Sequence, residues 1–416
     1  MPGARNYDHR VSRALKIRFV SMHTSPATLP GSGDAGGMNV VERSAAEALA
    51  ALGHTVELVT RRSHPDDPDL VELNPGVTLR HLDAGPRTPL AKSVIDDHIE
   101  EFSSGLSKLE PTDVLHSHHW MSGVAALPVA AQWGVPHVQS YHSVAAPDGS
   151  PLSAGEPPES PRRVPGEALV ATESQAVVAI SAAEARTVIE RCGASAERVT
   201  IVSPGVDQNL FRPLVPGEQR WSWPTAETEA WSRGYVLFAA RLQPLKDPDL
   251  AIRALAALDH SIRPHLVVAG DASVDFSHYE EDLRELVTDL GLAETVTFVG
   301  PQPRPELARL MRGARVMLVP SHSETFGLVA LEAQASGTPV IAAAAGGLRE
   351  AVAHGETGQL MDSRRPEDWG LALTRLLTEP GLLERMGIVA RVHARRFEWR
   401  WAAQRLVSIY EGLLDS

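Results

Sequence analysis

The chain has 416 residues, enough for two or three domains at roughly 100–200 residues per domain. Hydrophobic residues make up 43% of it and charged residues 22%, a globular composition that argues against global disorder. The formal net charge of −13 disfavours a nucleic-acid partner, because proteins that bind a phosphate backbone are usually basic. The one cysteine, Cys192, excludes a disulfide framework and a multi-cysteine metal site, and we expect it to be buried.

The N-terminal end shows no targeting segment. The first sixteen residues are polar and basic without an apolar core, unlike a signal peptide. The longest apolar stretch, at 123–131, is far shorter than the roughly 20 residues of a membrane-spanning helix. We therefore expect a cytoplasmic protein that does not insert into a membrane.

Short apolar runs alternate with segments of helical periodicity along the chain. Strand-like runs lie at 16–22, 55–60, 77–82, 113–117, 137–141, 176–181 and 198–202, and then at 235–240, 265–270, 295–300, 315–320 and 339–343. Helical patterns lie at 38–52, 120–132, 249–258, 279–290, 328–336 and 399–414. This alternation is typical of parallel sheets covered by helices on both faces. It predicts an α/β fold of two doubly wound, Rossmann-like domains.

The boundary between the domains is predicted near residue 205, where the periodic pattern gives way to a stretch rich in Pro, Trp and Glu. We expect an N-terminal domain over 1–205, completed by a C-terminal helix at 397–416, and a second domain over 206–396. A proline-rich stretch at 145–165 is long enough to be a functional loop. Ligands bind beyond the carboxyl ends of such strands, so the chemistry is expected in a cleft between the domains.

A glycine-rich segment, 31–40, follows the first strand and leads into a helix. Gly31, Gly33 and Gly36 formally match G-x-G-x-x-G, but eight residues separate the strand from the first glycine, unlike a dinucleotide-binding motif. We expect backbone amides here to face a phosphate. Arg61 and Arg62 follow the second strand and would suit a 2′-phosphate, which keeps an NADP-dependent oxidoreductase as a minor alternative.

Two later loops place charged residues at strand-to-helix turns. Arg241 and Lys246 follow the run at 235–240, where two cations can hold a diphosphate and stabilise charge on a departing nucleoside diphosphate. Glu324 precedes Thr-Phe-Gly at the start of a helix, and Glu332 lies eight residues on. Carboxylates there can accept hydrogen bonds from sugar hydroxyls, and the helix N-terminal amides at 326–329 can hold phosphate oxygens.

A metal site is not expected. His116, His118 and His119 crowd one strand end, but no carboxylate or cysteine completes a ligand set beside them, and we expect polar rim residues. The cation pair and helix N-termini can offset diphosphate charge without a metal, so no cofactor is required and magnesium is compatible but not essential.

The segment 323–332, Ser-Glu-Thr-Phe-Gly-Leu-Val-Ala-Leu-Glu, resembles the signature of the family 4 retaining glycosyltransferases, which have the two-domain GT-B architecture. Arg241 with Lys246 resembles their diphosphate clamp, and the similarity runs from about residue 16 to the C-terminal helix. The resemblance implies that the N-terminal domain binds a small polar acceptor and the C-terminal domain a nucleoside-diphosphate sugar.

The resemblance also implies roles for individual residues. The implied catalytic residues are Arg241, Lys246, Glu324 and His142. The implied donor-binding residues are Gly36, Gly37, Gln302, Phe326, Gly327, Leu328, Val329 and Glu332. The implied acceptor-binding residues are His23, Asn39, Lys92, His119, Ser143 and Arg162.

Within this family, the strings at 21–40, 116–123, 241–246 and 332–343 resemble the D-inositol-3-phosphate glycosyltransferases, which begin mycothiol synthesis. Some positions depart from that group: His119 replaces Tyr, Ser143 replaces Thr, and Gln302 replaces Arg in the loop that contacts the base. Asp148 stands in a run where that group has a lysine. A new acid near an anion site disfavours an anionic acceptor.

These departures favour a diverged natural-product enzyme of an antibiotic pathway. The lincosamide-pathway S-glycosyltransferase, which joins a GDP-octose to ergothioneine, is such an enzyme, and Asp148, Glu156 or Glu159 would supply an acidic partner for that zwitterion. The alternative is transfer from UDP-N-acetylglucosamine to inositol 3-phosphate. The sequence leaves open GDP against UDP, and a monomer against a homodimer.

Overall fold

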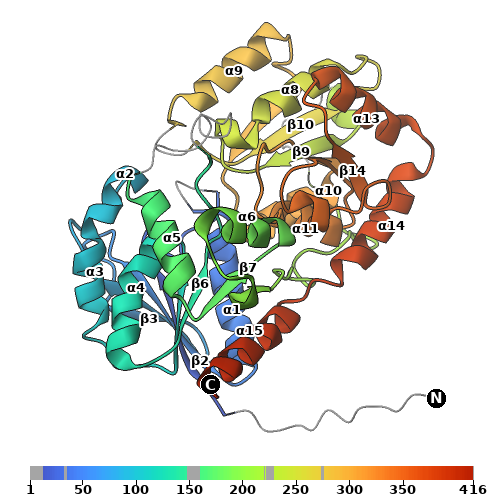
Figure 1. Ribbon diagram of the computed structural model, residues 1–416. Helices are drawn as coiled ribbons and strands as arrows, with labels where there is room; N and C mark the ends of the chain where they lie inside the picture. Colours follow the sequence, from blue (N-terminus) through green and yellow to red (C-terminus); the bar gives the residue numbers. More distant parts are fainter. Residues whose placement is uncertain are drawn as a thin grey trace, which may run out of the picture.

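The computed structural model describes residues 13–31, 35–147, 160–219, 221, 229–272 and 276–415. It confirms an α/β fold with two sheets, built from strands β1–β8 and β9–β14 (Figure 1). The predictions for Gly33, Asp148, Glu156 and Glu159 lie outside the described residues. Cys192 is buried, as predicted.

The first sheet has eight strands in the order β3-β4-β2-β1-β5-β6-β7-β8, all parallel except β3. Its strands are β1 (Lys16–Ser21), β2 (Thr55–Arg61), β3 (Leu70–Asn74), β4 (Val77–Leu82), β5 (Val114–His118), β6 (His137–Ser140), β7 (Ala176–Ala179) and β8 (Val199–Ile201). Its helices are α1 (Gly37–Ala51), α2 (Lys92–Ile95), α3 (Ile99–Leu106), α4 (Trp120–Trp133), α5 (Arg163–Glu173) and α6 (Ala182–Cys192).

The second sheet has six parallel strands in the order β11-β10-β9-β12-β13-β14. Its strands are β9 (Tyr235–Ala239), β10 (His265–Ala269), β11 (Val296–Gly300), β12 (Val316–Val319), β13 (Val340–Ala343) and β14 (Gly358–Met361). The helices that follow residue 228 are α7 (Glu229–Ser232), α8 (Pro248–Ala256), α9 (Tyr279–Asp289), α10 (Arg304–Gly313), α11 (Leu328–Ala335), α12 (Leu348–Ala351), α13 (Pro366–Thr378), α14 (Leu382–Ala394) and α15 (Trp399–Leu414).

Alternating side chains of the buried strands form a separate core on each face of each sheet. In β9, Tyr235 and Leu237 pack with α10 and α11, whereas Val236 and Phe238 pack with α8 and α13. In the first domain, one core joins β1 and β2 to α1 and α15, a second lies under α3 and α4, and a third joins β7 to α5 and α6. The uninterrupted apolar runs of the sequence reflect this burial on two faces.

The chain crosses between the two domains at two adjacent segments. Val206 N–H donates to the carbonyl of Phe397 at 3.0 Å. Gly205 packs directly against the second of these segments, because a Cβ on Gly205 would stand 2.2 Å from the backbone nitrogen of Trp399. Helix α15 then returns to the first domain and packs on α1 (Figure 1). The domain limits stay a prediction, and this junction is where we expect any hinge.

Candidate active site

A cavity of about 310 Å³ lies between the two domains. Loops at the carboxyl ends of several strands line it, as expected for doubly wound sheets. Its lining includes every residue predicted for the site except Arg162. The structure thus brings these residues together, and their individual roles stay predictions.

Arg162 lies away from the cavity. Its guanidinium donates to the carbonyl of Asp96 and pairs with Glu100 at 2.7 Å. The next residue, Arg163, is buried, pairs with Glu167 at 2.8 Å, and has Nη2 3.3 Å from Ser143 Oγ, a lining atom. The sequence analysis missed Arg163, although its spacing of four from Glu167 on a helix is a signal for an ion pair.

The lysine predicted to clamp the diphosphate is paired with the carboxylate predicted to bind the sugar. Lys246 Nζ lies 2.6 Å from Glu324 Oε1, and Ser321 Oγ donates to the same oxygen at 2.9 Å. Asp247, next in the chain, has a left-handed backbone (φ 51°), caps α8 and is ion-paired with Arg364. These contacts fix the direction in which Lys246 projects.

Glycines fix the loop that carries Glu324. Gly347 N–H donates to the Glu324 carbonyl at 2.8 Å, and a Cβ on Gly346 would stand 2.1 Å from that carbonyl oxygen. Gly327 caps α11 with φ 99°, and a Cβ there would meet Leu348 at 2.5 Å. Only glycine suits such a position, so the amides that begin α11 can approach a phosphate.

Glu332 is buried on α11 and forms an ion pair with Arg304 at 2.9 Å. Burial raises the pKa of Glu332, and the nearby Arg304 opposes that rise. Arg304 begins the helix after β11, at the carboxyl end of a strand. Arg304 was not predicted from the sequence, although it follows a strand in the same way as Arg241, which was.

The glycine-rich loop packs against the clamp. A Cβ on Gly36 would stand 3.6 Å from Arg241 Nε, and one on Gly37 3.4 Å from Leu328. Asn39 Oδ1 accepts from Gly36 N–H at 2.9 Å, and its amide nitrogen donates to Thr24 Oγ1 at 3.0 Å. Asn39 therefore joins the glycine-rich loop to the segment that holds Thr24.

The histidines are buried rather than on a polar rim, so that expectation is wrong. His116, His118 and His119 are 1–2% exposed. His142 has φ 60°, its carbonyl accepts from Thr325 of the other domain at 2.7 Å, and burial lowers the pKa of its imidazole to about 3. The His23 and His119 rings are in tilted contact, with centroids 4.1 Å apart, and burial with the nearby Lys92 lowers the pKa of His23 well below the usual value. These rings are neutral near pH 7.

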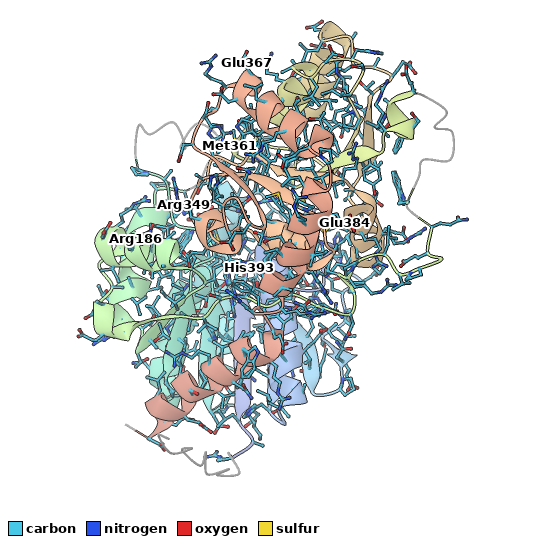
Figure 2. All side chains as sticks on the ribbon, turned by 90° about the vertical axis from the view of Figure 1, so that its right-hand side faces the viewer. Arg186, Arg349, Met361, Glu367, Glu384 and His393 are labelled. Carbon is cyan, nitrogen blue, oxygen red and sulfur yellow. The ribbon has the colours of Figure 1, made fainter. Side chains whose placement is uncertain are left out.

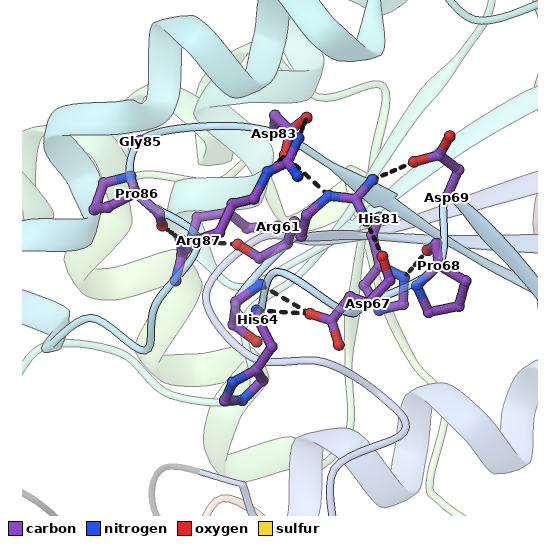
Figure 3. A network of polar contacts seen from close by, with 12 residues as sticks. Arg61, His64, Asp67, Pro68, Asp69, His81, Asp83, Gly85, Pro86 and Arg87 are labelled. Atoms are coloured by element: carbon purple, nitrogen blue, oxygen red, sulfur yellow. Dashed lines mark hydrogen bonds and ion pairs between the residues drawn. The ribbon is translucent and has the colours of Figure 1, made fainter.

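Arginines at the end of β2 anchor the loop that leads to Lys92 (Figure 3). Arg61 donates to the carbonyl of Pro86 at 2.8 Å. Arg62 donates to Asp83 at 2.9 Å and to other oxygens of the neighbouring loop. Both guanidinium groups form hydrogen bonds within the chain. The two cations that suggested NADP binding are therefore occupied, and they no longer support that alternative.

Within the described ranges, no group of three or more His, Cys, Asp or Glu side chains is arranged to hold a metal ion. In the same part of the chain, no helix combines the length and the apolar character that crossing a bilayer requires.

Two family models match the chain: a glycosyl transferase 4-like domain over residues 36–205 and the glycosyl transferases group 1 over 219–393. Its curated relatives include the D-inositol 3-phosphate glycosyltransferase of Thermomonospora curvata, 42% identical, with 96% of each chain covered. That of Frankia alni is also 42% identical, covering 95% of this chain and 98% of the relative.

Solved structures of the same architecture include sucrose-phosphate synthase from Thermosynechococcus elongatus, with a TM-score of 0.85, 27% identity and coverage of 96% of this chain and 99% of that one. Anabaena HepE in complex with UDP-glucose has a TM-score of 0.72 at 19% identity, covering 96% of this chain and all of that one. The second likeness shows the fold alone.

The cavity lies between two Rossmann-like domains, the cations and carboxylates predicted for a sugar nucleotide face it, and the relatives match along nearly the whole chain. The chain therefore belongs to the group 1 glycosyl transferases of the GT-B class, and it is a glycosyltransferase.

Proposed function

We propose that the chain is a retaining glycosyltransferase that moves a sugar from a UDP-sugar to D-inositol 3-phosphate. The observation that carries the proposal is the charge of the cavity. Among the described residues, four cations line it, Lys92, Arg241, Lys246 and Arg304. Among the described residues, two acids line it, and both are ion-paired, Glu324 with Lys246 and Glu332 with Arg304. Such a cavity suits two anionic ligands.

The acceptor is proposed to bind between His23, His119 and Lys92. Burial is the main cause that lowers the pKa of His23 and His119, and the charges of Lys92 and Arg163 lower it further, so their positive field reaches this end of the cavity. A phosphate there would meet cations, as an anionic acceptor requires. Relatives named for inositol 3-phosphate, at about 40% identity, support the same choice.

Ergothioneine is the less supported acceptor. The acids expected to pair with ergothioneine, Asp148, Glu156 or Glu159, lie outside the described residues. The relatives reported above are named for inositol 3-phosphate. Inositol 3-phosphate, the alternative acceptor in the sequence analysis, is therefore better supported than ergothioneine.

For the donor, UDP is proposed because a solved structure of the same fold, HepE, holds UDP-glucose. UDP-N-acetylglucosamine is the first donor to test. Gln302, which lines the cavity after β11, has its amide nitrogen bonded to the Val299 carbonyl at 2.6 Å and is the candidate contact to the base.

The geometry supports a mechanism without an enzymic nucleophile. Among the described residues, both carboxylates that line the cavity are ion-paired, and Lys246 and Arg241, together with the amides at the start of α11, would stabilise charge on the departing diphosphate. The acceptor hydroxyl would attack on the face that the phosphate leaves. The new glycosidic bond forms as the sugar–phosphate bond breaks, and the leaving phosphate oxygen takes the hydroxyl proton.

The test is calorimetric titration of the UDP-saturated protein with D-inositol 3-phosphate, with uncharged inositol and with ergothioneine. Inositol 3-phosphate is expected to bind best, and Lys92→Ala to weaken it by about tenfold to a hundredfold, the value of one charge-assisted contact. Lys108→Ala, at an exposed lysine, is the matched control. Tighter binding of ergothioneine than of inositol 3-phosphate would overturn the proposed acceptor.

A further inference from the structure

A buried carboxyl group lies behind the predicted catalytic histidine, and the proposed transfer step does not use it. Glu42, on α1, has 0% exposure. Neither of its carboxyl oxygens has a hydrogen-bond partner among the described residues. Burial raises its pKa well above the usual value, and the nearby Ser21 side chain, whose hydroxyl donates to the Thr24 carbonyl at 2.9 Å, offsets only part of that rise. A buried polar group without a hydrogen-bond partner lowers the stability of the fold. Stability therefore does not explain why a glutamate occupies this position.

Glu42 lies beside the nitrogen through which two histidines are joined. Its Oε1 is 3.9 Å from His118 Nδ1, and the same Nδ1 lies 2.8 Å from His142 Nε2. The two ring planes are nearly parallel, with an interplanar angle of 17° and centroids 5.1 Å apart. His142 lines the cavity, whereas Glu42 and His118 do not, so the three side chains form a line from the core to the site.

The contact between the two imidazoles couples their tautomers. In neutral rings one nitrogen must carry the proton and the other must accept it. The carbonyl oxygen of the buried Glu42 carboxyl, near His118 Nδ1, favours the proton on that nitrogen, because its lone pairs attract the N–H. His118 then donates to His142 Nε2, and the proton of His142 is on Nδ1. His142 Nδ1 has no partner within the described structure.

We propose that Glu42 and His118 are positioning residues that hold His142 as its Nδ1–H tautomer, so that this N–H donates to an oxygen of the donor sugar. The inference rests on the proposed function, because it needs a sugar nucleotide in the cavity. Glu42 touches no substrate and acts through His118.

The first test is ¹⁵N NMR of the ligand-free protein labelled at histidine, in which the two ring-nitrogen shifts report the tautomer. The His142 signal is assigned by its loss in a His142→Asn variant. The wild type is expected to show the Nδ1–H tautomer, and Glu42→Leu a substantial Nε2–H population. An unchanged tautomer in Glu42→Leu, or an Nε2–H wild type, would overturn the inference.

The second test separates positioning from structural support. Glu42→Leu is expected to keep or raise the melting temperature, because it removes a buried group without a partner. It should also lower affinity for UDP-N-acetylglucosamine relative to UDP by about threefold to tenfold, the value of one hydrogen bond. Glu42→Gln, which retains an oxygen, should restore part of that ratio. Ser336→Ala, which removes a buried hydroxyl that also has no hydrogen-bond partner among the described residues, is the control and should leave the ratio unchanged.

The outcomes distinguish the two proposals. A wild type that does not bind UDP refutes the proposed donor site and leaves the ligand-free tautomer result standing. A Glu42→Leu variant that unfolds, or that lowers UDP and UDP-N-acetylglucosamine affinity equally, shows a structural role and overturns the positioning role.

Discussion

Lys246 and Glu324 form an ion pair of 2.6 Å at the cavity, and each side chain is 15% exposed. If Lys246 binds the diphosphate and Glu324 the sugar hydroxyls, as proposed, a sugar nucleotide has to exchange this contact for its own. The pair neutralises and orients both side chains. The two residues were recognisable from sequence, but their mutual contact was not, because 78 positions separate them.

Replacing Lys246 is expected to lower turnover more than binding. Lys246→Ala should reduce kcat by about 10²-fold or more, since one lost donor to a developing oxyanion costs roughly 3 kcal/mol in the transition state. Release of nucleoside diphosphate at saturating donor measures this, with the exposed Lys108→Ala as control. Turnover of Lys246→Ala within a few-fold of the wild type would exclude a role for this lysine in stabilising the leaving group.

The buried histidines should make the fold sensitive to acid. His137 lies between the hydroxyls of Ser117 and Ser174, at 2.8 and 2.9 Å, and burial lowers its pKa to about 3. Between about pH 6.5 and 3 the unfolded chain therefore binds more protons at this residue, and stability falls as the pH falls. Glu184, whose pKa burial raises to about 7, acts in the opposite direction between about pH 7 and 4.5.

His137→Gln should consequently flatten the acid response. Between pH 7.5 and 5.5 the loss of unfolding free energy should shrink by about 1.4 kcal/mol, the value of one pH unit of titration below the unfolded histidine pKa. Urea unfolding at the two pH values measures it. Equal losses in the variant and the wild type would mean that His137 is not neutral in the fold.

At the scale of elements, the sequence identified the buried strands well and the edge strands poorly. The run 235–240 predicts β9 because both faces of that strand are covered. Strands β3 and β14 were missed: Leu70–Asn74 is half exposed and pairs antiparallel with β4, and Gly358–Met361 is a short sheet edge. An edge strand with few buried side chains needs few apolar residues, so its sequence shows only a weak hydrophobic pattern.

The start of α11 should depend on Gly327. Gly327→Ala introduces a Cβ 2.5 Å from Leu348 at a residue with φ 99°, which would displace the amides predicted to hold phosphate. We expect UDP affinity to fall by at least tenfold, or about 1.4 kcal/mol. Gly355→Ala is the matched control, with φ 79° but no atom within 4 Å of the added Cβ. Calorimetry with UDP compares them, and equal affinities would remove α11 from the donor site.

At the scale of the whole molecule, the two domains meet through contacts that the sequence could not reveal. Glu350 of α12 accepts hydrogen bonds from the N–H groups of Ala182 and Ala183, at the start of α6 in the other domain. Figure 2 labels Arg186 on α6 and Arg349 on α12, the two helices that this contact joins. A carboxylate at a helix N-terminus is favourable, so Glu350 stabilises the contact between the domains.

Glu350→Ala should therefore favour domain opening about the junction at residues 205–206 and 397–399. Without ligand, its radius of gyration in small-angle scattering should exceed that of the wild type, and UDP should reduce the difference. Glu356→Ala, an exposed acid nearby, is the control. Identical radii for Glu350→Ala and the wild type, with and without UDP, would contradict a hinge restrained by this contact.

The central claim is transfer of a sugar from a nucleotide to an inositol phosphate with retention of configuration. Proton NMR of a mixture of the protein, UDP-N-acetylglucosamine and D-inositol 3-phosphate tests it directly, because the anomeric coupling constant reports the configuration of the new bond. We predict UDP release matched by an α-linked product, with no product from uncharged inositol at the same concentration. A β-linked product, or transfer to ergothioneine and none to inositol 3-phosphate, would contradict the account.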